Sequence, residues 1–258
     1  MSTTFLTPSC SLRQLITDIN SIHAKKNERE KMFTTPIGCL VFIAASLKAI
    51  NSEIIKRNGR RLPSLLTGFT KRLFTLVGLW GIDPFLTTLQ LKYPASGCSY
   101  CHALPCSCGA TKEKPWKQEG NIRLGADQSE WSLSEWQSHH LLVYGMKNST
   151  LSSDRLVAWQ GEEFLETFIA IGWLEYARTH SLPTHSGVEA LAQELPDLFM
   201  RTLAIANHQV IDIETLLIER YRNGCAKCQE RFCICPDTTG DFELFEQHTL
   251  AGTRPAKE

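Results

Sequence analysis

Eight of the ten cysteines in this 258-residue chain form two clusters with the same internal spacing. The clusters are Cys98-x2-Cys101-x4-Cys106-x-Cys108 and Cys225-x2-Cys228-x4-Cys233-x-Cys235. Four thiolates can complete a tetrahedral Zn²⁺ site without an open position. The spacing therefore predicts two structural zinc sites, one at the end of each half. Reduced free thiols or redox-labile disulfides are the alternatives, because the Cys-x-Cys end is tighter than a usual CxxC pair.

Further paired motifs indicate that the chain is a tandem repeat of one domain. A repeat at a fixed period is considered first, because it decides the whole fold. The matched pairs are Leu62-Pro63 with Leu195-Pro196, Ile82-Asp83 with Ile211-Asp212, and Tyr93 with Tyr221. We divide the chain into a first repeat (1–110), a linker (111–130), a second repeat (131–236) and a tail (237–258).

The apolar periodicity within each half is helical, and sustained strand alternation is not seen outside the cysteine clusters. In the second half it predicts helices at 133–144, 156–179, 196–210 and 213–221. The fold class is therefore all-α, with two helical bundles that each end in a small four-cysteine module.

The composition is that of a soluble globular protein, with 43% hydrophobic and 21% charged residues. We find no apolar run of about 18 residues and no basic-then-apolar start typical of a secretory signal. These features predict a cytoplasmic protein without a membrane partner. In that compartment, clustered CxxC pairs indicate metal ligands rather than disulfides.

The net charge of zero hides an asymmetry between the halves. Residues 1–110 carry 13 Lys/Arg and 5 Asp/Glu, a net charge of +8, and the remainder carries −8. Such opposite charges suggest mutual contact, or a shared site for an anionic ligand and its metal. The alternative is that the two surfaces are simply solvated differently.

Two pairs of carboxylates stand out in the second half. Glu163 and Glu166 are three residues apart and share a helix face, and Glu194 and Asp197 repeat this spacing. An intervening turn would let the two helices run antiparallel, so that the four carboxylates converge. Oxygen ligands of this kind suit Mg²⁺ or Mn²⁺, which also bind substrate phosphates. Solvated helix faces are the alternative explanation for each pair.

The same residues resemble the MazG-like family of all-α nucleoside triphosphate pyrophosphohydrolases. The resemblance covers roughly residues 131–236 and includes both carboxylate pairs, Asn207, Ile211-Asp212 and the four-cysteine end. It implies hydrolysis of a nucleoside triphosphate to a monophosphate and pyrophosphate, with Glu163, Glu166, Glu194 and Asp197 holding Mg²⁺. Asn207 matches a polar position near the family's site.

One departure from the family pattern concerns Pro196, which separates the last two carboxylates. Because proline is tolerated in the first turn of a helix, this position predicts a third helix that starts near Glu194. The geometry of the metal ligands is then expected to differ from that of the family.

The first half lacks the carboxylates. Glu53 is the single acidic residue between Lys31 and Ile82. The position of Asp197 aligns with Ser64 when the Leu-Pro motifs are matched, and with Gly68 when the Ile-Asp motifs are matched. The family acts as dimers with substrate near the interface, so we expect an internal pseudo-dimer. The basic residues of its first half could then face a triphosphate or lie solvated: Lys56, Arg57, Arg60, Arg61, Lys71 and Arg72.

Other side chains are candidates for substrate contacts. Trp159 lies one turn before Glu163 and could stack a base, although core packing is an equal alternative. Lys147, with His139 and His140 before it, could reach a phosphate. For the histidines, a surface or core position is the alternative.

Three functions are consistent with these features. The first is an Mg²⁺-dependent nucleotide pyrophosphohydrolase whose first repeat supports pairing, a homo-oligomer or a protein partner. The second is a non-catalytic module that binds a nucleotide or a partner. The third is a zinc-containing nucleic-acid binder, which is less expected because the cysteine clusters lack a basic surround interleaved with aromatics.

Overall fold

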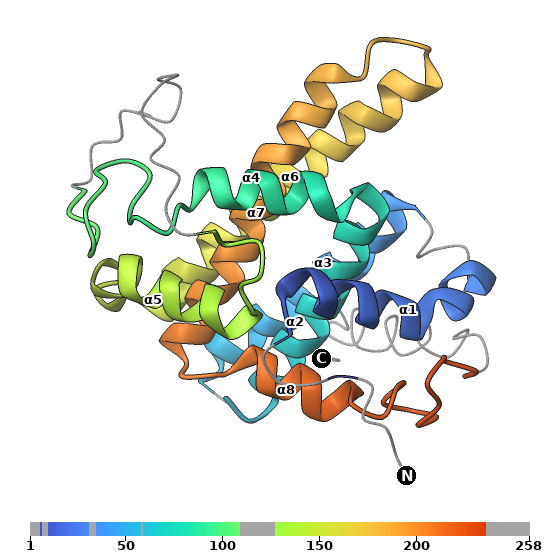
Figure 1. The fold of residues 1–258 in the computed structure, drawn as a ribbon, viewed down its shortest axis with the longest axis horizontal. Helices are drawn as coiled ribbons and strands as arrows, with labels where there is room; N and C mark the ends of the chain where they lie inside the picture. Colours follow the sequence, from blue (N-terminus) through green and yellow to red (C-terminus); the bar gives the residue numbers. More distant parts are fainter. Residues whose placement is uncertain (1–5, 7–9, 31–34, 58, 109–126, 236–258) are drawn as a thin grey trace, which may run out of the picture.

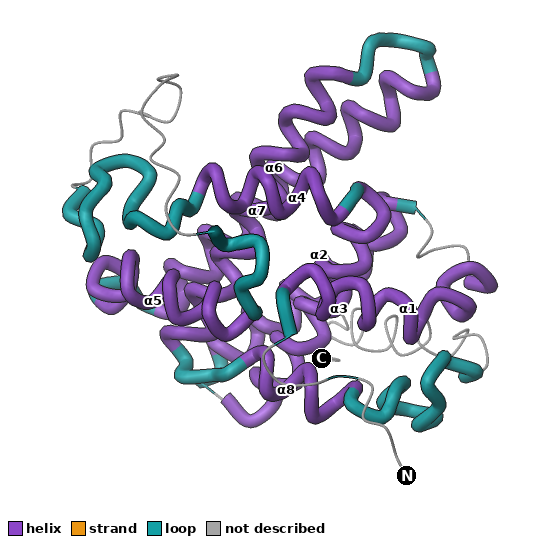
Figure 2. The backbone as a smooth tube through the Cα atoms, viewed as in Figure 1, coloured by secondary structure: helices purple, strands orange, loops and turns teal. Residues whose placement is uncertain are grey.

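The computed structural model describes residues 6, 10–30, 35–57, 59–108 and 127–235 (Figure 1). Within these residues the chain is all-helical, with loops, turns and two cysteine modules but no strand (Figure 2). The predicted tail, and all but the last four residues of the predicted linker, lie outside the described residues.

Each half contains four α-helices in succession, and the first half has an additional short 3-10 helix between its second and third. The first half contains α1 (Leu12–Glu30), α2 (Pro36–Ile55), the short 3-10 helix η2 (Gly59–Arg61), α3 (Leu62–Trp80) and α4 (Ile82–Lys92). The second half contains α5 (Leu133–Ser149), α6 (Ser153–Thr179), α7 (His185–His208) and α8 (Ile213–Tyr221). A four-cysteine module follows each fourth helix.

Side-chain caps explain where several helices begin. Ser132 and Glu135 form a reciprocal capping box at the start of α5. Ser152 caps α6, and Asp212 caps α8 by accepting a hydrogen bond from the Thr215 amide. Thr35 caps α2, whose first residue is the proline Pro36. The predicted end of the second helix and both bounds of the fourth are confirmed.

The predicted start of the third helix near Glu194 is wrong. Helix α7 begins at His185 and continues through Pro196. Pro196 has no N–H, so the Ala192 carbonyl one turn earlier loses its usual donor. The adjoining carbonyl of Gln193 accepts a hydrogen bond from Lys92 Nζ at 2.7 Å. Contacts with other helices therefore support the helix where proline weakens it.

The fourth helix of each half packs on the other half. Helix α4 contacts α7, and α8 contacts α3, while α2 contacts α6 across the middle. Each cysteine module likewise contacts the half of the chain to which it does not belong. The Cys106 amide donates to the Val143 carbonyl of α5, and the Cys233 amide donates to the Ile22 carbonyl of α1. One hydrophobic core spans both halves, with Phe74 and Phe85 packed against Phe199.

The ends of α6 and α7 extend beyond the rest of the molecule as a helical hairpin (Figure 1). Leu165, Ile169 and Trp173 form an exposed apolar row along α6. By length and composition, α2 is apolar enough to cross a membrane, but core helices pass the same test. Helix α2 packs against α3 and α6.

Candidate functional site

Three of the four predicted carboxylates come together. Glu163 and Glu166 lie on α6 and Glu194 lies on α7, and their carboxylate oxygens fall within 4.8 Å of one another. The two helices pack side by side along the hairpin, so residues distant in sequence share one face. Three oxygen ligands at this separation could hold a divalent cation.

The electrostatics of the cluster favour a bound cation. Burial and then the neighbouring Glu166 raise the pKa of Glu194 to about 7. Burial and then the negative charge of Asp197 also raise the pKa of Glu163. Both shifts show that the charged carboxylates are destabilised here, and a divalent cation would relieve their repulsion.

The fourth carboxylate, Asp197, is held by two residues of the first half. Lys92 Nζ lies 2.5 Å from Asp197 Oδ2, and the Tyr93 hydroxyl donates to Asp197 Oδ1 at 2.6 Å. Both Lys92 and Tyr93 stand at the end of α4. Because burial, followed by Asp197, raises the pKa of Tyr93, its phenol stays protonated as a donor. Asp197 borders the three-carboxylate cluster without belonging to it.

A second cation, Arg201, also faces the cluster from α7. Its Nε donates to Glu163 Oε1 at 3.1 Å, and its guanidinium lies 4.9 Å from the centroid of the Trp159 ring. Arg155 approaches the same ring at 5.3 Å. Trp159 is thus stacked with arginines at the edge of the site, where its ring orients Arg201.

The other residues predicted to contact substrate instead pack between helices or lie away from the three carboxylates. The side-chain amide of Asn207 donates through Nδ2 to the backbone carbonyl of Gln137 at 3.0 Å and links α7 to α5. His139 and His140 are buried, and burial lowers the pKa of both, to about 3 for His140. His139 Nε2 lies 3.1 Å from the Pro94 carbonyl. Lys147 lies in the last turn of α5, whereas the three clustered carboxylates are on α6 and α7.

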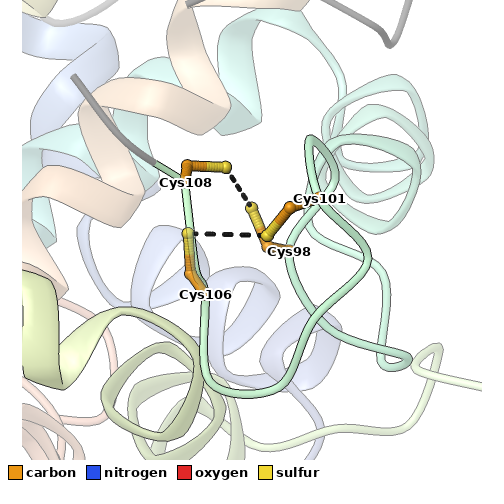
Figure 3. Close-up of side chains that lie close together, drawn as sticks. All are labelled: Cys98, Cys101, Cys106 and Cys108. Atoms are coloured by element: carbon orange, nitrogen blue, oxygen red, sulfur yellow. Dashed lines mark hydrogen bonds between the residues drawn. The ribbon is translucent and has the colours of Figure 1, made fainter. Parts of the chain in front are cut away.

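The four sulfurs of each cysteine cluster lie within 4.8 Å of one another, which is compatible with a tetrahedral thiolate site. Cys98 Sγ lies 3.7 Å from Cys108 Sγ, and Cys101 Sγ lies 4.0 Å from Cys106 Sγ (Figure 3). In the second module Cys225 Sγ lies 3.8 Å from Cys235 Sγ. Zinc–sulfur bonds of about 2.3 Å at tetrahedral angles place sulfurs about 3.8 Å apart. None of the ten cysteines, all of which lie in the described part of the chain, forms a disulfide, so each cluster could hold zinc.

The turn that opens each module has the same backbone hydrogen bond. The Cys98 amide donates to the Ala103 carbonyl at 3.1 Å, and the Cys225 amide donates to the Glu230 carbonyl at 2.8 Å. Gly97 and Gly224 precede these cysteines with φ of +128° and +101°. A Cβ on Gly224 would lie 2.2 Å from the Glu230 carbonyl oxygen, so the turn needs glycine.

Comparisons with protein-family models, curated proteins and solved structures return no match. The function of the chain therefore has to be inferred from its own residues and their geometry.

The sequence patterns did not assign Lys92, Tyr93 and Arg201 to the site. Arg201 had a detectable signal, because it lies four residues after Asp197 and thus on the same face of α7. Tyr93 served only as a marker of the repeat. Lys92 could be placed only with the knowledge that α4 packs on α7.

Proposed function

We propose that the chain is an Mg²⁺- or Mn²⁺-dependent nucleoside triphosphate pyrophosphohydrolase of the MazG-like type, with its active site in the second half. The convergence of Glu163, Glu166 and Glu194 within 4.8 Å carries this proposal. In the reaction, water adds to the α-phosphorus of the substrate. The bond from that phosphorus to the bridging oxygen breaks, and pyrophosphate leaves with that oxygen.

The residues present fit a hard divalent cation. Glu163, Glu166 and Glu194 would supply its oxygen ligands, and Asp197 lies beside them. Such a cation, when bound, offsets the carboxylate charge and attracts phosphate oxygens. Arg201 orients Glu163 through their hydrogen bond, while Lys92 and Arg201 supply positive charge for a triphosphate.

The exchange of elements supports an internal pseudo-dimer. Helix α4 of the first half reaches the acidic site, whereas α8 of the second half occupies the matching place on α3. We infer that 1–110 and 131–236 arose by duplication and that the first copy lost its carboxylates. That copy is retained because it supplies Lys92 and Tyr93 to the site of the other copy.

The cysteine modules are assigned to structural Zn²⁺. Each offers four sulfurs within 4.8 Å of one another, which completes a tetrahedral site. Each also docks onto the first helix of the other half. Zinc would therefore stabilise the contact between the halves rather than take part in the reaction.

Turnover measurements test the proposed reaction. Purified protein with its zinc content verified is incubated with each NTP and dNTP plus Mg²⁺, and nucleoside monophosphate and pyrophosphate are quantified. We expect both products in equal amounts from at least one nucleotide. No turnover on any nucleotide with Mg²⁺ or Mn²⁺ would rule the proposal out. A homo-oligomer or protein partner is a further prediction, for which size-exclusion chromatography with light scattering is the test.

The second candidate function is nucleotide binding without catalysis. The ion pair between Lys92 and Asp197 favours this function. Asp197 corresponds to a metal-binding carboxylate of the family that it resembles, and here Lys92 already neutralises its charge. Nucleotide binding by calorimetry, with zero turnover under the same conditions, would select this function over the first.

A further inference from the structure

The first half contains an arrangement that repeats the cationic part of the acidic site. Arg72 on α3 lies 5.8 Å from the centroid of the Phe42 ring on α2, and its Nη1 donates to Ser46 Oγ at 2.6 Å. Arg201 makes the same two contacts, with Trp159 and Glu163. In both halves the polar partner follows the aromatic residue by one helical turn.

These matched contacts fix the register between the halves. Ser46 stands where the second half has Glu163, and Gly68 stands where it has Asp197. The same register pairs Ala49 with Glu166 and Leu65 with Glu194. All four carboxylates of the acidic site thus have uncharged counterparts. The acidic residue Glu53 lies two turns beyond Ser46 on α2, and it pairs with Arg61 at 4.0 Å.

The two positively charged residues of the acidic site, Lys92 and Arg201, correspond to Arg220 and Arg72 in the second arrangement. Arg220 on α8 precedes Tyr221 as Lys92 precedes Tyr93, and its Nη1 donates to Ser64 Oγ at 3.3 Å. Arg220 also lies 5.8 Å from the centroid of the Tyr221 ring. A Cβ on Gly68 would lie 3.4 Å from Arg72 Nη1, so the Arg72 guanidinium turns back along α3 toward the end at which Ser64 lies.

The acidic site combines four carboxylates with Lys92 and Arg201. Among the described residues, its counterpart combines uncharged side chains at the four carboxylate positions with Arg72 and Arg220. The sign of the local charge is therefore reversed between the two halves.

We propose that Arg72, Arg220 and Ser64 form a site for an oligophosphate anion, such as pyrophosphate or the phosphate chain of a nucleotide, that binds without a divalent cation. Arginine presents a planar set of donors that matches phosphate oxygens, and the exposed Ser64 hydroxyl adds a neutral donor. The buried Ser46 donates to the Phe42 carbonyl and accepts from Arg72, so its role is to position Arg72. Loss of the carboxylates removes both the metal ligands and the charge that would repel phosphate. The choice of an oligophosphate rests on the proposed function, whereas binding of an anion does not.

Calorimetric titration of the full chain with pyrophosphate, and separately with dATP, tests this site. The buffer contains no added divalent cation, and retention of zinc is checked by metal analysis. We expect one binding site in the wild-type protein and a loss of affinity of at least about tenfold in Arg72→Met, as expected when a charge-assisted hydrogen bond is removed. Lys48→Met is the matched control, because Lys48 is an exposed cation on the same helix as Ser46.

A second variant restores the charge of the acidic site. Ser46→Glu places a carboxylate beside Arg72, as Glu163 lies beside Arg201, and we expect it to abolish anion binding. Because Ser46 is buried, circular dichroism is used to verify the fold of the variant. Ser46→Gln adds nearly the same volume without the charge and is expected to bind more tightly than Ser46→Glu.

Several results would overturn the site. They are the absence of wild-type binding, a strict need for Mg²⁺, or unchanged affinity in both Arg72→Met and Ser46→Glu. Tighter binding of a single-stranded oligonucleotide at the same residues would overturn the assignment to a small anion. Similar affinities for pyrophosphate and dATP support recognition of the phosphate chain, and a preference for dATP supports added recognition of the base. Failure of nucleotide hydrolysis alone would reject the proposed function but not this site.

Discussion

Lys92 Nζ lies 2.5 Å from Asp197 Oδ2, although these residues belong to opposite halves of the chain. The contact joins the last turn of α4 to the middle of α7, and Tyr93 reinforces it by donating to the other carboxylate oxygen. The first half therefore takes part in the candidate site even though it lacks counterparts of the four site carboxylates. Its contribution is a positive charge and a phenol.

Replacing Lys92 with methionine is expected to destabilise the metal-free protein. Both side chains of the pair are largely buried, with 15% of Lys92 and 21% of Asp197 exposed, so Asp197 would be left uncompensated near Glu163 and Glu194. We expect a loss of roughly 2 to 4 kcal/mol in the free energy of unfolding, measured by urea denaturation. Mg²⁺ should recover part of this loss by taking over the neutralisation.

The double variant Lys92→Met/Asp197→Asn is the control for this prediction. It removes both charges, so its stability should exceed that of Lys92→Met alone. Equal losses in the single and double variants would show that the ion pair is not the cause.

Glu163→Gln is expected to reduce nucleotide turnover at least about a hundredfold, because it removes a metal ligand while keeping the side-chain volume. The matched control is Glu162→Gln, since Glu162 is the exposed neighbour on the same helix. Initial rates of pyrophosphate release at saturating Mg²⁺ provide the measurement. Comparable rates in the wild-type protein and Glu163→Gln would remove Glu163 from the site.

The fold class and most of the candidate site follow from local patterns. The i, i+3 spacing placed Glu163 and Glu166 on one face of a helix, and the antiparallel turn brought Glu194 to them. The identical cysteine spacing predicted the two clusters. These features depend on residues close in sequence, where periodicity and spacing constrain the geometry directly.

The features that the sequence did not predict depend on packing between the halves. The partner of Asp197 is decided by where α4 lies, and the pattern of α4 is equally compatible with packing on its own half. The early start of α7 has the same origin. Pro196 is tolerated in mid-helix because its neighbours Leu195 and Leu198 are fully buried, so tertiary contacts offset the local cost.

Divalent metal binding is expected to weaken below about pH 7. The pKa of Glu194 is raised to about 7 by burial and by Glu166, so in the metal-free protein this carboxyl is mostly protonated at lower pH. Metal must displace that proton, and the apparent Kd for Mn²⁺ should rise up to about tenfold for each pH unit below this value. Calorimetry across this range is the measurement. Glu194→Gln should bind more weakly with a flatter pH profile, and a flat wild-type profile would contradict the assignment.

Gly224→Ala is expected to lower the zinc content from two ions per chain to one. Gly224 has a φ of +101°, and a Cβ there would lie 2.2 Å from the Glu230 carbonyl oxygen, which accepts the hydrogen bond of the Cys225 amide. The turn that presents Cys225 and Cys228 would therefore have to open. Elemental analysis after gel filtration measures the zinc, and thermal denaturation should show a lower Tm because the module docks on α1 through Cys233.

Two glycine variants separate this local effect from a general one. Gly97→Ala alters the equivalent turn of the first module, where a Cβ would lie 2.8 Å from the Ala103 carbonyl oxygen, so it should act in the same direction with a smaller loss. Gly161 lies inside α6, where an added Cβ would meet no described atom within 4 Å, so Gly161→Ala should retain both zinc ions and stabilise the helix by about 1 kcal/mol. Two zinc ions in Gly224→Ala would show that the turn does not control metal binding. The absence of zinc from the wild-type protein would instead leave the clusters as reduced thiols.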